Sequence, residues 1–403
     1  MAKSYILTGL DIGSSSIKAL IAFKKSNSSD FEILSQVSEP SFGIRRGVVV
    51  DIERVSGIIK SVLDKAQKGC GQEIEGVFVN IGGTHIFSTS SHGTVVVSRA
   101  DQEISQEDID RVLEAAQTFS LPPNREILDV LPREFIVDGK KEIKQPLSMR
   151  GVRLEVETLV LCAFSPYLKN LSQTVLNTGF QIDGWVISPL ASSKAVLTSR
   201  EKELGVILLD IGARTTGLAM FKEGDLIHTV ILPIGSGHIT DDIGIGLKTD
   251  PDTAERIKLE FGSCLLKGMR KKKRVKEEGS GEILVFTQDA LGKIIDPRIS
   301  EILEQARKEI KKSAGQEIFP VGVVLAGGGA RLPKIKELAK KILKLPVRIG
   351  VPRSFFPVPE DPALSVVCGL VLQRWESQQE KGSLGLIGTI GSKIKKIFRS
   401  FIP

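Results

Sequence analysis

The chain alternates between short apolar runs, typical of strands, and longer stretches with apolar positions at helical spacing. Such alternation predicts an α/β fold in which sheets and helices form layers. In the first half we expect strands near 31–37, 44–50, 76–81 and 181–187, and helices near 51–68, 106–119, 166–178 and 190–199. In the second half we expect helices near 251–261, 298–313 and 362–374, and a strand, a turn and a helix within 321–343.

One hairpin-like pattern occurs twice in the chain. Residues 9–22 read GLDIGSSSIKALIA, and residues 208–221 read LLDIGARTTGLAMF. In both segments an apolar strand ends in Asp-Ile-Gly, a small turn with hydroxyl residues follows, and a second apolar strand returns. Two copies about 200 residues apart predict two similar lobes that each open with the same hairpin.

The remaining pattern subdivides these lobes. Residues 84–164 are polar and strand-rich at first, contain a helix capped by Ser105, and continue with strands near 126–137 and 153–163, which indicates an inserted subdomain. Residues 240–320 contain a charged segment, GMRKKKRVKEEGSGE, that we interpret as a loop. We expect a first lobe of 1–83 and 165–202 with an insertion at 84–164, a second-lobe core of 203–239 and 321–373 with a subdomain at 240–320, a linker at 374–383 and a tail at 384–403.

Composition and charge are those of an ordinary globular protein with a moderate positive balance. The 403 residues carry a formal net charge of +7, which suits a negatively charged partner. The four cysteines are scattered without a CxxC pair or histidines at ligand spacing, so we expect reduced thiols and no structural metal. The sequence has no signal-peptide pattern, and no apolar stretch approaches the roughly 20 residues of a spanning helix.

The basic run from Arg270 to Lys276 concentrates part of this charge. We interpret it as a solvated loop, with added attraction to a membrane as the alternative. Because no aromatic residues are interleaved with these cations, we expect no nucleic-acid partner.

The two Asp-Ile-Gly turns carry residue types that bind phosphate. A tight turn of glycine and small hydroxyl residues presents backbone N–H groups at close range, and a nearby lysine adds positive charge. Asp11 and Asp210 each end an apolar strand, where a carboxylate is costly unless a cation such as Mg²⁺ needs it. The candidate phosphate-binding residues are Gly13, Ser14, Ser15, Ser16 and Lys18 in the first turn and Gly212, Ala213, Arg214, Thr215 and Thr216 in the second.

A third glycine-rich element follows near the end of the second lobe. In VVLAGGGARLPKIKELAKK, residues 323–341, an apolar strand runs through Gly327, Gly328 and Gly329 towards a helix, with Arg331 just beyond. This order is typical of backbone contact with a nucleotide at a helix N-terminus. It is not a Walker A motif, because no GKS or GKT follows, and it is not GxGxxG.

Taken together, these motifs resemble the actin/Hsp70/sugar-kinase superfamily. LDIGSSSIKA corresponds to its first phosphate motif, LLDIGARTT to its second and VVLAGGGARLP to its adenosine motif. Within the superfamily the whole chain resembles the FtsA family of bacterial cell-division proteins, whose distinctive SHS2-like subdomain would be the insertion at 84–164. The resemblance implies an actin-like fold of two ribonuclease-H-like lobes that bind ATP and Mg²⁺ between them. It also places Gly235, in LPIGSGHITDDIGIGL, and Glu255 and Lys258, in DTAERIKLEFG, at the nucleotide site.

The resemblance implies partners as well. LGKIIDPRISEIL, residues 291–303, resembles the region that receives the C-terminal peptide of the tubulin-like protein FtsZ, where Lys293 and Arg298 would complement acidic residues. Plain surface charge is the alternative for these two cations. We further expect head-to-tail self-assembly, later division proteins at the insertion, and a location at the cytoplasmic face of the inner membrane at the division site.

The tail has the pattern of a helix that lies on a membrane surface. At 100° per residue its apolar residues fall within an arc of about 120°, and its cations fall on the other side. Such a helix binds anionic lipid headgroups, whereas the alternative is a terminal helix that packs on the protein's own core. The apolar positions are Leu386, Ile387, Ile390, Ile394, Ile397, Phe398 and Phe401, and the cationic ones are Lys393, Lys395, Lys396 and Arg399.

The sequence leaves ATP hydrolysis open and favours slow turnover at most. ATPases of the superfamily position the attacking water with a polar or acidic side chain at the head of the helix that closes the first lobe, and here WVISPLASSKAVL, residues 185–197, offers Ser188. The second turn departs from the usual DIGGGTTD, because Arg214 replaces a glycine and Gly217 replaces an acid. Without a positioned base, we expect about 10²–10⁴-fold slower hydrolysis.

Two other functions fit the same superfamily. A PilM-like type IV pilus assembly protein would share the fold and the insertion but would lack the tail. A small-molecule kinase would need a catalytic aspartate that faces a substrate cleft. An MreB-like filament fits less well, because its insertion differs.

Overall fold

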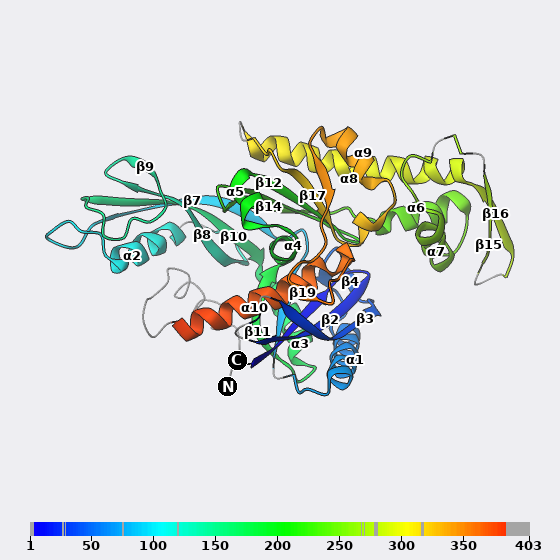
Figure 1. Cartoon of the computed structure of the whole chain (residues 1–403), viewed down its shortest axis with the longest axis horizontal. Coiled ribbons are helices and arrows are strands. Elements are labelled where there is room, and N and C mark those ends of the chain that lie inside the picture. Colours follow the sequence, from blue (N-terminus) through cyan, green and yellow to red (C-terminus); the bar gives the residue numbers. More distant parts are fainter. Residues whose placement is uncertain are drawn as a thin grey trace.

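The computed structural model describes residues 4–383 except 26–27, 29, 75, 119–120, 267, 270, 278–280 and 316–317. Two α/β lobes lie one above the other, and a strand-rich unit extends from them on one side (Figure 1). One large cluster of buried apolar residues centres on lobe 1 and reaches the facing side of the lobe 2 sheet, and a second lies within lobe 2. Two cores are the expected solution for a chain of this length.

Lobe 1 is built around a six-stranded sheet in the order β11-β6-β1-β2-β3-β19. Helix α1 begins where the Asp51 side chain accepts a hydrogen bond from the Arg54 N–H, and it ends at Gly71, which adopts the left-handed conformation. Strand β19 and helix α10 belong to lobe 1, although the sequence predicted residues 321–373 to be part of the second-lobe core, because β19 pairs with β3 and α10 packs on β1 and against α4. The elements are β1 (Ser4–Ile12), β2 (Ser16–Lys25), β3 (Phe31–Pro40), β4 (Ile44–Arg45), β5 (Val48–Val49), α1 (Ile52–Cys70), β6 (Gly76–Ile81), α3 (Ser165–Leu176), β11 (Gln181–Ile187), α4 (Ser188–Val196), α5 (Ser199–Leu204), β19 (Phe355–Phe356), η2 (Pro362–Leu364) and α10 (Ser365–Ser383).

Lobe 2 repeats the same arrangement around the strand β12, which runs antiparallel to β13 and parallel to β17. Its far end carries α6, α7 and the two-stranded hairpin β15–β16 (Figure 1). The elements are β12 (Val206–Ile211), β13 (Thr216–Lys222), β14 (Asp225–Leu232), α6 (Gly237–Leu247), α7 (Pro251–Phe261), β15 (Lys272–Lys276), β16 (Ile283–Thr287), α8 (Gln288–Ala314), β17 (Gly322–Ala326), η1 (Gly328–Arg331), α9 (Ile335–Leu343) and β18 (Val347–Ile349).

The insertion forms the third unit and has a small core of its own, built from residues such as Ile109, Phe135 and Leu154. Its helix α2 opens with a capping box between Ser105 and Asp108, as the sequence predicts. Its strands join those of lobe 2 in one nine-stranded sheet, β18-β17-β12-β13-β14-β7-β10-β8-β9. The elements are β7 (Phe87–Val96), α2 (Gln106–Gln117), β8 (Arg125–Val137), β9 (Lys140–Ile143) and β10 (Arg153–Phe164).

The two Asp-Ile-Gly segments fold into equivalent hairpins, which confirms the internal repeat. In β1–β2 Asp11 lies opposite Lys18, and in β12–β13 Asp210 lies opposite Gly217. Each turn is closed by the same backbone hydrogen bond, from Gly13 N to Ser16 O at 3.2 Å and from Gly212 N to Thr215 O at 2.9 Å. The paired lobes therefore present two matching turns.

The charged segment that we interpret as a loop is in part a strand. Residues Lys272–Lys276 form β15 and pair with β16 in antiparallel register. Val275 is 6% exposed, and the Lys273 ammonium lies 4.9 Å from the centre of the Phe261 ring. The loop prediction is wrong because one buried valine is hidden among six cationic neighbours in the run, which masks the period-two pattern.

Helix α10 continues through the segment predicted as a linker. It extends to Ser383, so the described residues 374–383 are helical. Arg374 pairs with Asp183 at 2.5 Å, and the Trp375 ring packs edge-on against Tyr5 with 5.1 Å between the ring centres. The polar sequence misled the prediction because two of its side chains pack on lobe 1. The predicted tail at 384–403 lies outside the described residues.

Helix α8 is longer than expected, because it begins at Gln288 and continues through Pro297. Proline inside a helix removes one backbone hydrogen bond. The fully buried Leu291 and Ile295 before it, and Ile299 and Ile302 after it, keep both parts on one core face. Within the described residues, no helix combines the length and the apolar character needed to cross a membrane.

Candidate functional site: a cavity between the two lobes

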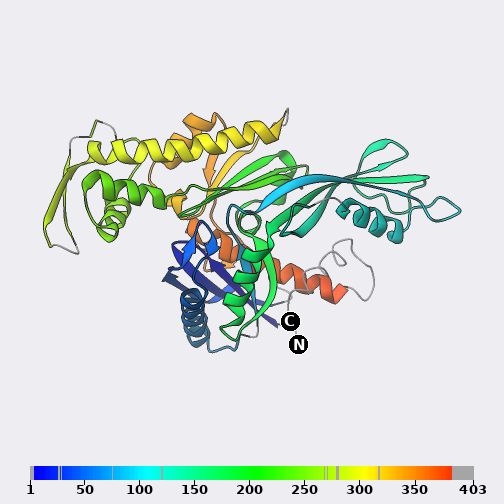
Figure 2. The same cartoon turned by 180° about the vertical axis from the view of Figure 1, so that it is seen from behind.

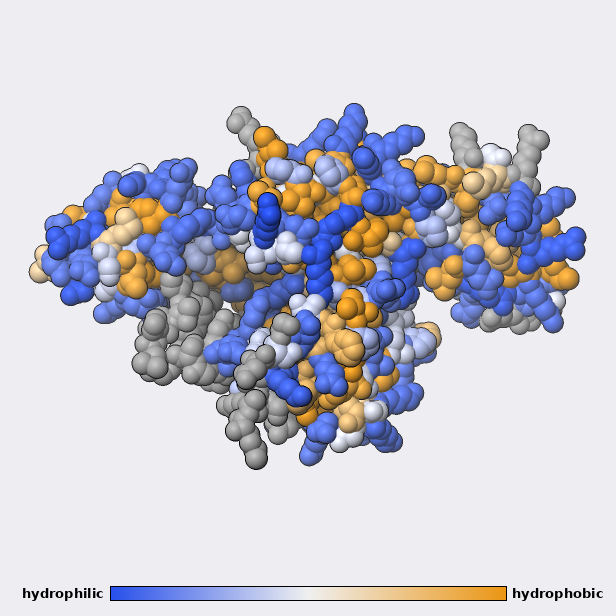
Figure 3. All heavy atoms as spheres, in the orientation of Figure 1, coloured by the Kyte–Doolittle hydropathy of each residue, from blue (hydrophilic) through white to orange (hydrophobic). Residues whose placement is uncertain are grey.

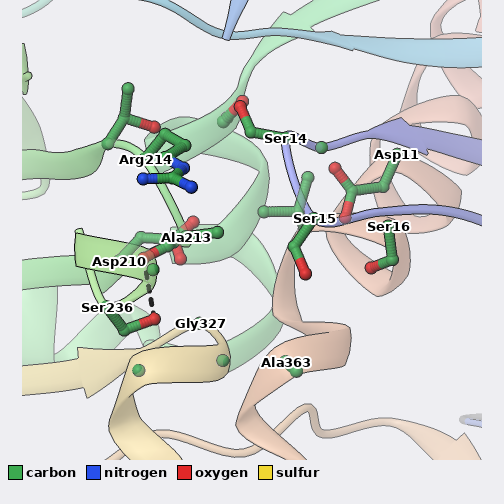
Figure 4. Close-up of a pocket in the computed structure, with 18 of the residues that line it drawn as sticks. Asp11, Ser14, Ser15, Ser16, Asp210, Ala213, Arg214, Ser236, Gly327 and Ala363 are labelled. Carbon is green, nitrogen blue, oxygen red and sulfur yellow. Dashed lines mark hydrogen bonds between the residues drawn. The ribbon is translucent and has the colours of Figure 1, made fainter. Parts of the chain in front are cut away.

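A cavity of about 450 Å³ lies between the lobes and is lined by the three predicted motifs. Figure 4 shows Ser14, Ser15 and Ser16 of the first turn facing Ala213 and Arg214 of the second, with Gly327 beneath them. The chain thus brings together segments that are about 200 and 300 residues apart. The predicted residues that line the cavity are Asp11, Gly13, Ser14, Ser15, Ser16, Lys18, Asp210, Gly212, Ala213, Arg214, Thr215, Glu255, Lys258, Gly327, Gly328, Gly329 and Arg331.

Two carboxylates, one from each lobe, reach this cavity. Asp11 is 5% exposed and Asp210 is 7% exposed, and the Lys18 ammonium pairs with Asp11 at 3.0 Å. Burial, together with the negative charge of Asp11, raises the pKa of Asp210 to about 7, although Lys18 acts in the opposite direction. Two buried carboxylates that repel each other favour a bound cation, because the cation removes their repulsion.

The second turn is held by the start of α6. The Ser236 N–H donates to the Gly212 carbonyl at 2.8 Å, and the Gly237 N–H donates to the Ala213 carbonyl at 2.7 Å. The Ser236 hydroxyl adds a bond to the Gly212 carbonyl at 3.1 Å, drawn as a dashed line in Figure 4. With its carbonyls bonded on the outer side, the turn can direct N–H groups into the cavity.

Three consecutive residues of α6 connect the cavity wall to the rest of lobe 2. The Thr240 hydroxyl accepts from Lys258 at 2.8 Å, and Lys258 pairs with Glu255 at 2.6 Å. Asp241 forms an ion pair with the Arg214 guanidinium, and the Arg214 side chain is 38% exposed at the cavity. Asp242 pairs with Arg298 of α8 at 2.6 Å. Three of the predicted cationic residues are therefore positioned by one helix.

The glycine-rich element passes directly beneath Asp210. Gly327 has φ +78°, and a Cβ there would lie 2.3 Å from Asp210 Oδ1, so a side chain cannot be accommodated. The Arg331 guanidinium pairs with the Asp361 carboxylate. The same carboxylate accepts a hydrogen bond from the Ala363 N–H at 2.9 Å, which fixes the loop that precedes α10. Asp361 was not predicted, since nothing in its local sequence links it to the glycines.

Asn80 is a second residue that sequence reasoning missed. It is 4% exposed and lines the cavity at the end of β6. Its Oδ1 accepts from the Ile12 N–H at 2.6 Å, and its Nδ2 donates to Ser188 Oγ at 3.1 Å. Ser188 Oγ in turn donates to the Ile81 carbonyl at 3.1 Å. Asn80 thereby joins the first turn to the head of α4.

Thr216 and Gly235, both predicted at the site, do not line the cavity. Thr216 is fully buried in β13, and its hydroxyl donates to the Ile234 carbonyl at 2.7 Å. Gly235 lies behind the second turn, where a Cβ would be 2.5 Å from the Gly212 carbonyl oxygen. Thr216 misses the cavity because strand alternation directs its side chain to the core. Both residues therefore support the second turn from behind.

Comparison with known proteins identifies the family of this chain. The model for Cell division protein FtsA matches residues 207–369, and the model for the SHS2 domain inserted in FTSA matches residues 83–162. The Cell division protein FtsA of Pseudomonas aeruginosa is 34% identical over 389 residues, which covers 95% of this chain and 93% of that protein. The chain belongs to the FtsA family. The Cell division protein FtsA of Bacillus subtilis, 36% identical over 373 residues, covers 92% of this chain and 84% of its own length.

Solved structures confirm the actin-like two-lobed fold. A PilM–PilN type IV pilus biogenesis complex matches 91% of this chain and 98% of its own with a TM-score of 0.67 at 18% identity. MreB5 of Spiroplasma citri bound to ADP matches 94% of this chain and 98% of its own with a TM-score of 0.56 at 13% identity. These similarities establish the fold alone, and the FtsA relatives favour a cell-division protein over a pilus protein or a small-molecule kinase.

The predicted partner-binding cations of this FtsA-family chain both lie on α8. Lys293 is 66% exposed and pairs with Asp289 at 2.8 Å. Arg298 is 27% exposed and is engaged by Asp242 and by Glu301 at 2.6 Å. Nearby on the hairpin, Ile283 and Val285 are 67% and 52% exposed, and Figure 3 shows apolar and hydrophilic residues intermixed at this end of lobe 2. Lys293 is therefore the more available of the two cations.

Proposed function

We propose that the chain binds ATP between its lobes and, as an actin-like cell-division protein, ties FtsZ filaments to the inner membrane. The observation that supports this most directly is the interlobe cavity, where both Asp-Ile-Gly turns and the three glycines meet. Nucleotide in this position contacts both lobes and so favours one degree of closure.

The residues that line the cavity fit a triphosphate and Mg²⁺. The two turns offer backbone N–H groups and serine hydroxyls to phosphate oxygens, and Asp11 and Asp210 would hold Mg²⁺ largely through water. When bound, the ion neutralises charge on the phosphates. Glu255 and Lys258 lie on the lobe 2 wall, where we place the ribose or base.

Calorimetry with Mg–ATP tests this first step. We expect binding by the full chain and at least a tenfold loss of affinity in Asp210→Ala, because that variant removes one of two facing carboxylates. Absence of any heat on well-folded chain, with no effect of the substitution in a sensitive assay, contradicts the proposal.

Hydrolysis should be slow because the cavity wall offers no free base at the head of α4. Ser188 Oγ donates its proton to the Ile81 carbonyl and accepts from Asn80, so only an acceptor lone pair remains for water. An alcohol oriented in this way can position a water molecule but is a poor proton acceptor. Phosphate release by the purified chain should therefore proceed far more slowly than nucleotide binding.

Recruitment of FtsZ is the second step, and we place it at the α8 end of lobe 2. Lys293→Glu should weaken binding of an FtsZ C-terminal peptide at least fivefold, since it reverses an exposed charge. Lys308→Glu, an exposed position on the same helix, is the matched control and should leave binding unchanged. Equal affinity for both variants removes Lys293 from the interface. Arg298→Glu is less informative, because it breaks a partly buried ion pair between α8 and α6, whereas Lys293 pairs with Asp289 on the exposed face of its own helix.

Membrane attachment is the third step, and it rests on the sequence of the tail. We expect the full chain to float with vesicles of anionic lipid, and a chain that ends at Ser383 to stay in the soluble fraction. The cut belongs after Ser383 because α10 extends that far and its Trp375 packs on lobe 1. Equal flotation of both chains rules the tail out as the anchor. Head-to-tail assembly would then make many weak tails act together.

A further inference from the structure

The insertion is connected to both lobes in different ways. By sequence it interrupts lobe 1, between β6 and α3, yet its strand β7 pairs with β14 of lobe 2. Figures 1 and 2 show from both sides the sheet that results, running from lobe 2 into the insertion. Any rotation of lobe 2 relative to lobe 1 must therefore move the insertion with lobe 2 or alter the contact between β7 and β14.

The contact between β7 and β14 is small. One ladder pair, Val230 with Phe87, joins the strands, whereas β7 and β10 pair along the whole of Phe87–Val96. Beside it, the Ser88 hydroxyl donates to the Thr229 carbonyl at 3.0 Å. At the outer surface Lys144 forms an ion pair with Asp225.

The base of the insertion is held together by contacts among its own residues, and it is joined to lobe 1 through the chain at both ends, by β6 and α3. The Arg125 guanidinium lies over the rings of Phe87 and Phe164, at 5.2 and 5.4 Å from their centres, and donates to the His85 carbonyl at 3.2 Å. Tyr167 of α3 packs edge-on against Phe164, with ring centres 5.0 Å apart. The β7–β14 contact is therefore the part most easily separated.

Helix α4 lies where the lobes meet, because it packs against α10 of lobe 1 and also on β12 and β13 of lobe 2, and we infer the direction of the effect by taking this crossing as the pivot. Helices α4 and α10 cross so closely that a Cβ on Gly369 would lie 1.7 Å from the Ala191 carbonyl oxygen. In Figure 1, α4 lies between β7 and β14 on one side and β4 and α6 on the other. The second side faces the cavity, because Gly47, just after β4, and Ile239, within α6, line it. When two bodies rotate about a pivot, closure on one side opens the other.

We propose that the β7–β14 contact is a latch that opposes closure of the lobes on nucleotide. ATP binding loosens the latch. A ligand of the insertion that tightens the latch therefore lowers ATP affinity, and a ligand that separates the latch raises it. ATP in turn changes the affinity for that ligand by the same factor. The inference rests on the proposed function, in that nucleotide must bind between the lobes.

A reversible crosslink across the latch tests this. Phe87→Cys with Val230→Cys, in a chain that also carries Cys70→Ser, places two thiols on directly opposed residues, where a disulfide fits. We expect the oxidised form to bind Mg–ATP about tenfold more weakly than the reduced form of the same protein. Saturating Mg–ATP should also slow formation of the disulfide by a similar factor. The matched control, His92→Cys with Glu157→Cys in the same Cys70→Ser background, crosslinks β7 to β10 inside the insertion and should bind equally in both forms.

A second pair of variants shifts the latch in the opposite direction. Lys144→Glu sets like charges together and should raise ATP affinity several-fold, and adding Asp225→Lys should restore the original value. If both redox forms bind Mg–ATP equally and the charge variants have no effect, the latch does not exist. If the reduced protein binds no ATP at all, the proposed function fails first, so the two failures are distinguishable.

Discussion

At the scale of single residues, Asp210 gives the cavity its clearest dependence on pH. Its pKa of about 7 lies far above the ordinary 3.8, because burial and Asp11 disfavour the charged form. The folded chain therefore holds this proton over a range in which the unfolded chain has lost it. Without ligand, the contribution of Asp210 to stability falls as the pH rises from about 4 to about 7 and then stays level.

Mg–ATP affinity should have the opposite dependence on pH. A cation favours the ionised carboxylate, so affinity should rise roughly tenfold between pH 6 and pH 8, as a group with a pKa of about 7 loses its proton. Isothermal titration over this range measures the change. Asp210→Asn should bind more weakly and retain only the pH dependence of the nucleotide itself. An unchanged slope in Asp210→Asn would assign the titration to another group.

Asn80 should matter for folding as well as for the cavity. Asn80→Ala leaves the Ile12 N–H without its 2.6 Å partner in a buried site, so we expect a loss of about 1–3 kcal/mol in the free energy of unfolding. Urea titration checks this value. Ser172→Ala, which removes a hydroxyl that donates to the Leu168 carbonyl of its own helix, is the control and should change stability little. Similar midpoints for both variants would contradict the role given to Asn80.

At the scale of elements, the crossing of α4 and α10 holds together the part of lobe 1 that packs, through α4, on β12 and β13 of lobe 2. Gly369 faces the Ala191 carbonyl with no space for a methyl group, so Gly369→Ala must push the helices apart. We expect it to cost about 1–3 kcal/mol of stability, the usual range for overpacking. Gly57→Ala in α1, where a Cβ meets nothing within 4 Å, is the matched change and should add about 0.5–1 kcal/mol. Thermal unfolding of the two variants should thus shift in opposite directions, and a common shift would show that Gly369 tolerates a side chain.

At the scale of the whole molecule, a ligand between the lobes should stabilise both together. At a concentration 100 times its dissociation constant, Mg–ATP should raise the free energy of unfolding by about 2.7 kcal/mol. Asp11→Asn and Asp210→Asn, one in each lobe, should each reduce that gain at the same nucleotide concentration. Denaturant titration with and without Mg–ATP measures it. If one variant retains the full gain, its lobe does not take part in binding.

The amino-acid sequence by itself determined the lobes and most of the cavity. The strands, the hairpin turns and the glycines depend on local periodicity and on backbone conformation, which are written into neighbouring residues. For this reason the two Asp-Ile-Gly turns and the strand before Gly327 were predicted where the structure has them.

Only the tertiary structure decided which distant groups meet. Asn80 reaches the cavity, and Asp361 binds the lining residue Arg331, from segments with no local signature. Thr216 turns away from the cavity because strand alternation directs its side chain to the core. The strand β15 and the second half of α10 depend on contacts of Lys273 with Phe261 and of Trp375 with Tyr5, which no local pattern reveals. The pairing of β7 with β14 joins the insertion to the lobe that it does not interrupt in sequence, since hydrogen bonding between strands depends on their positions in space.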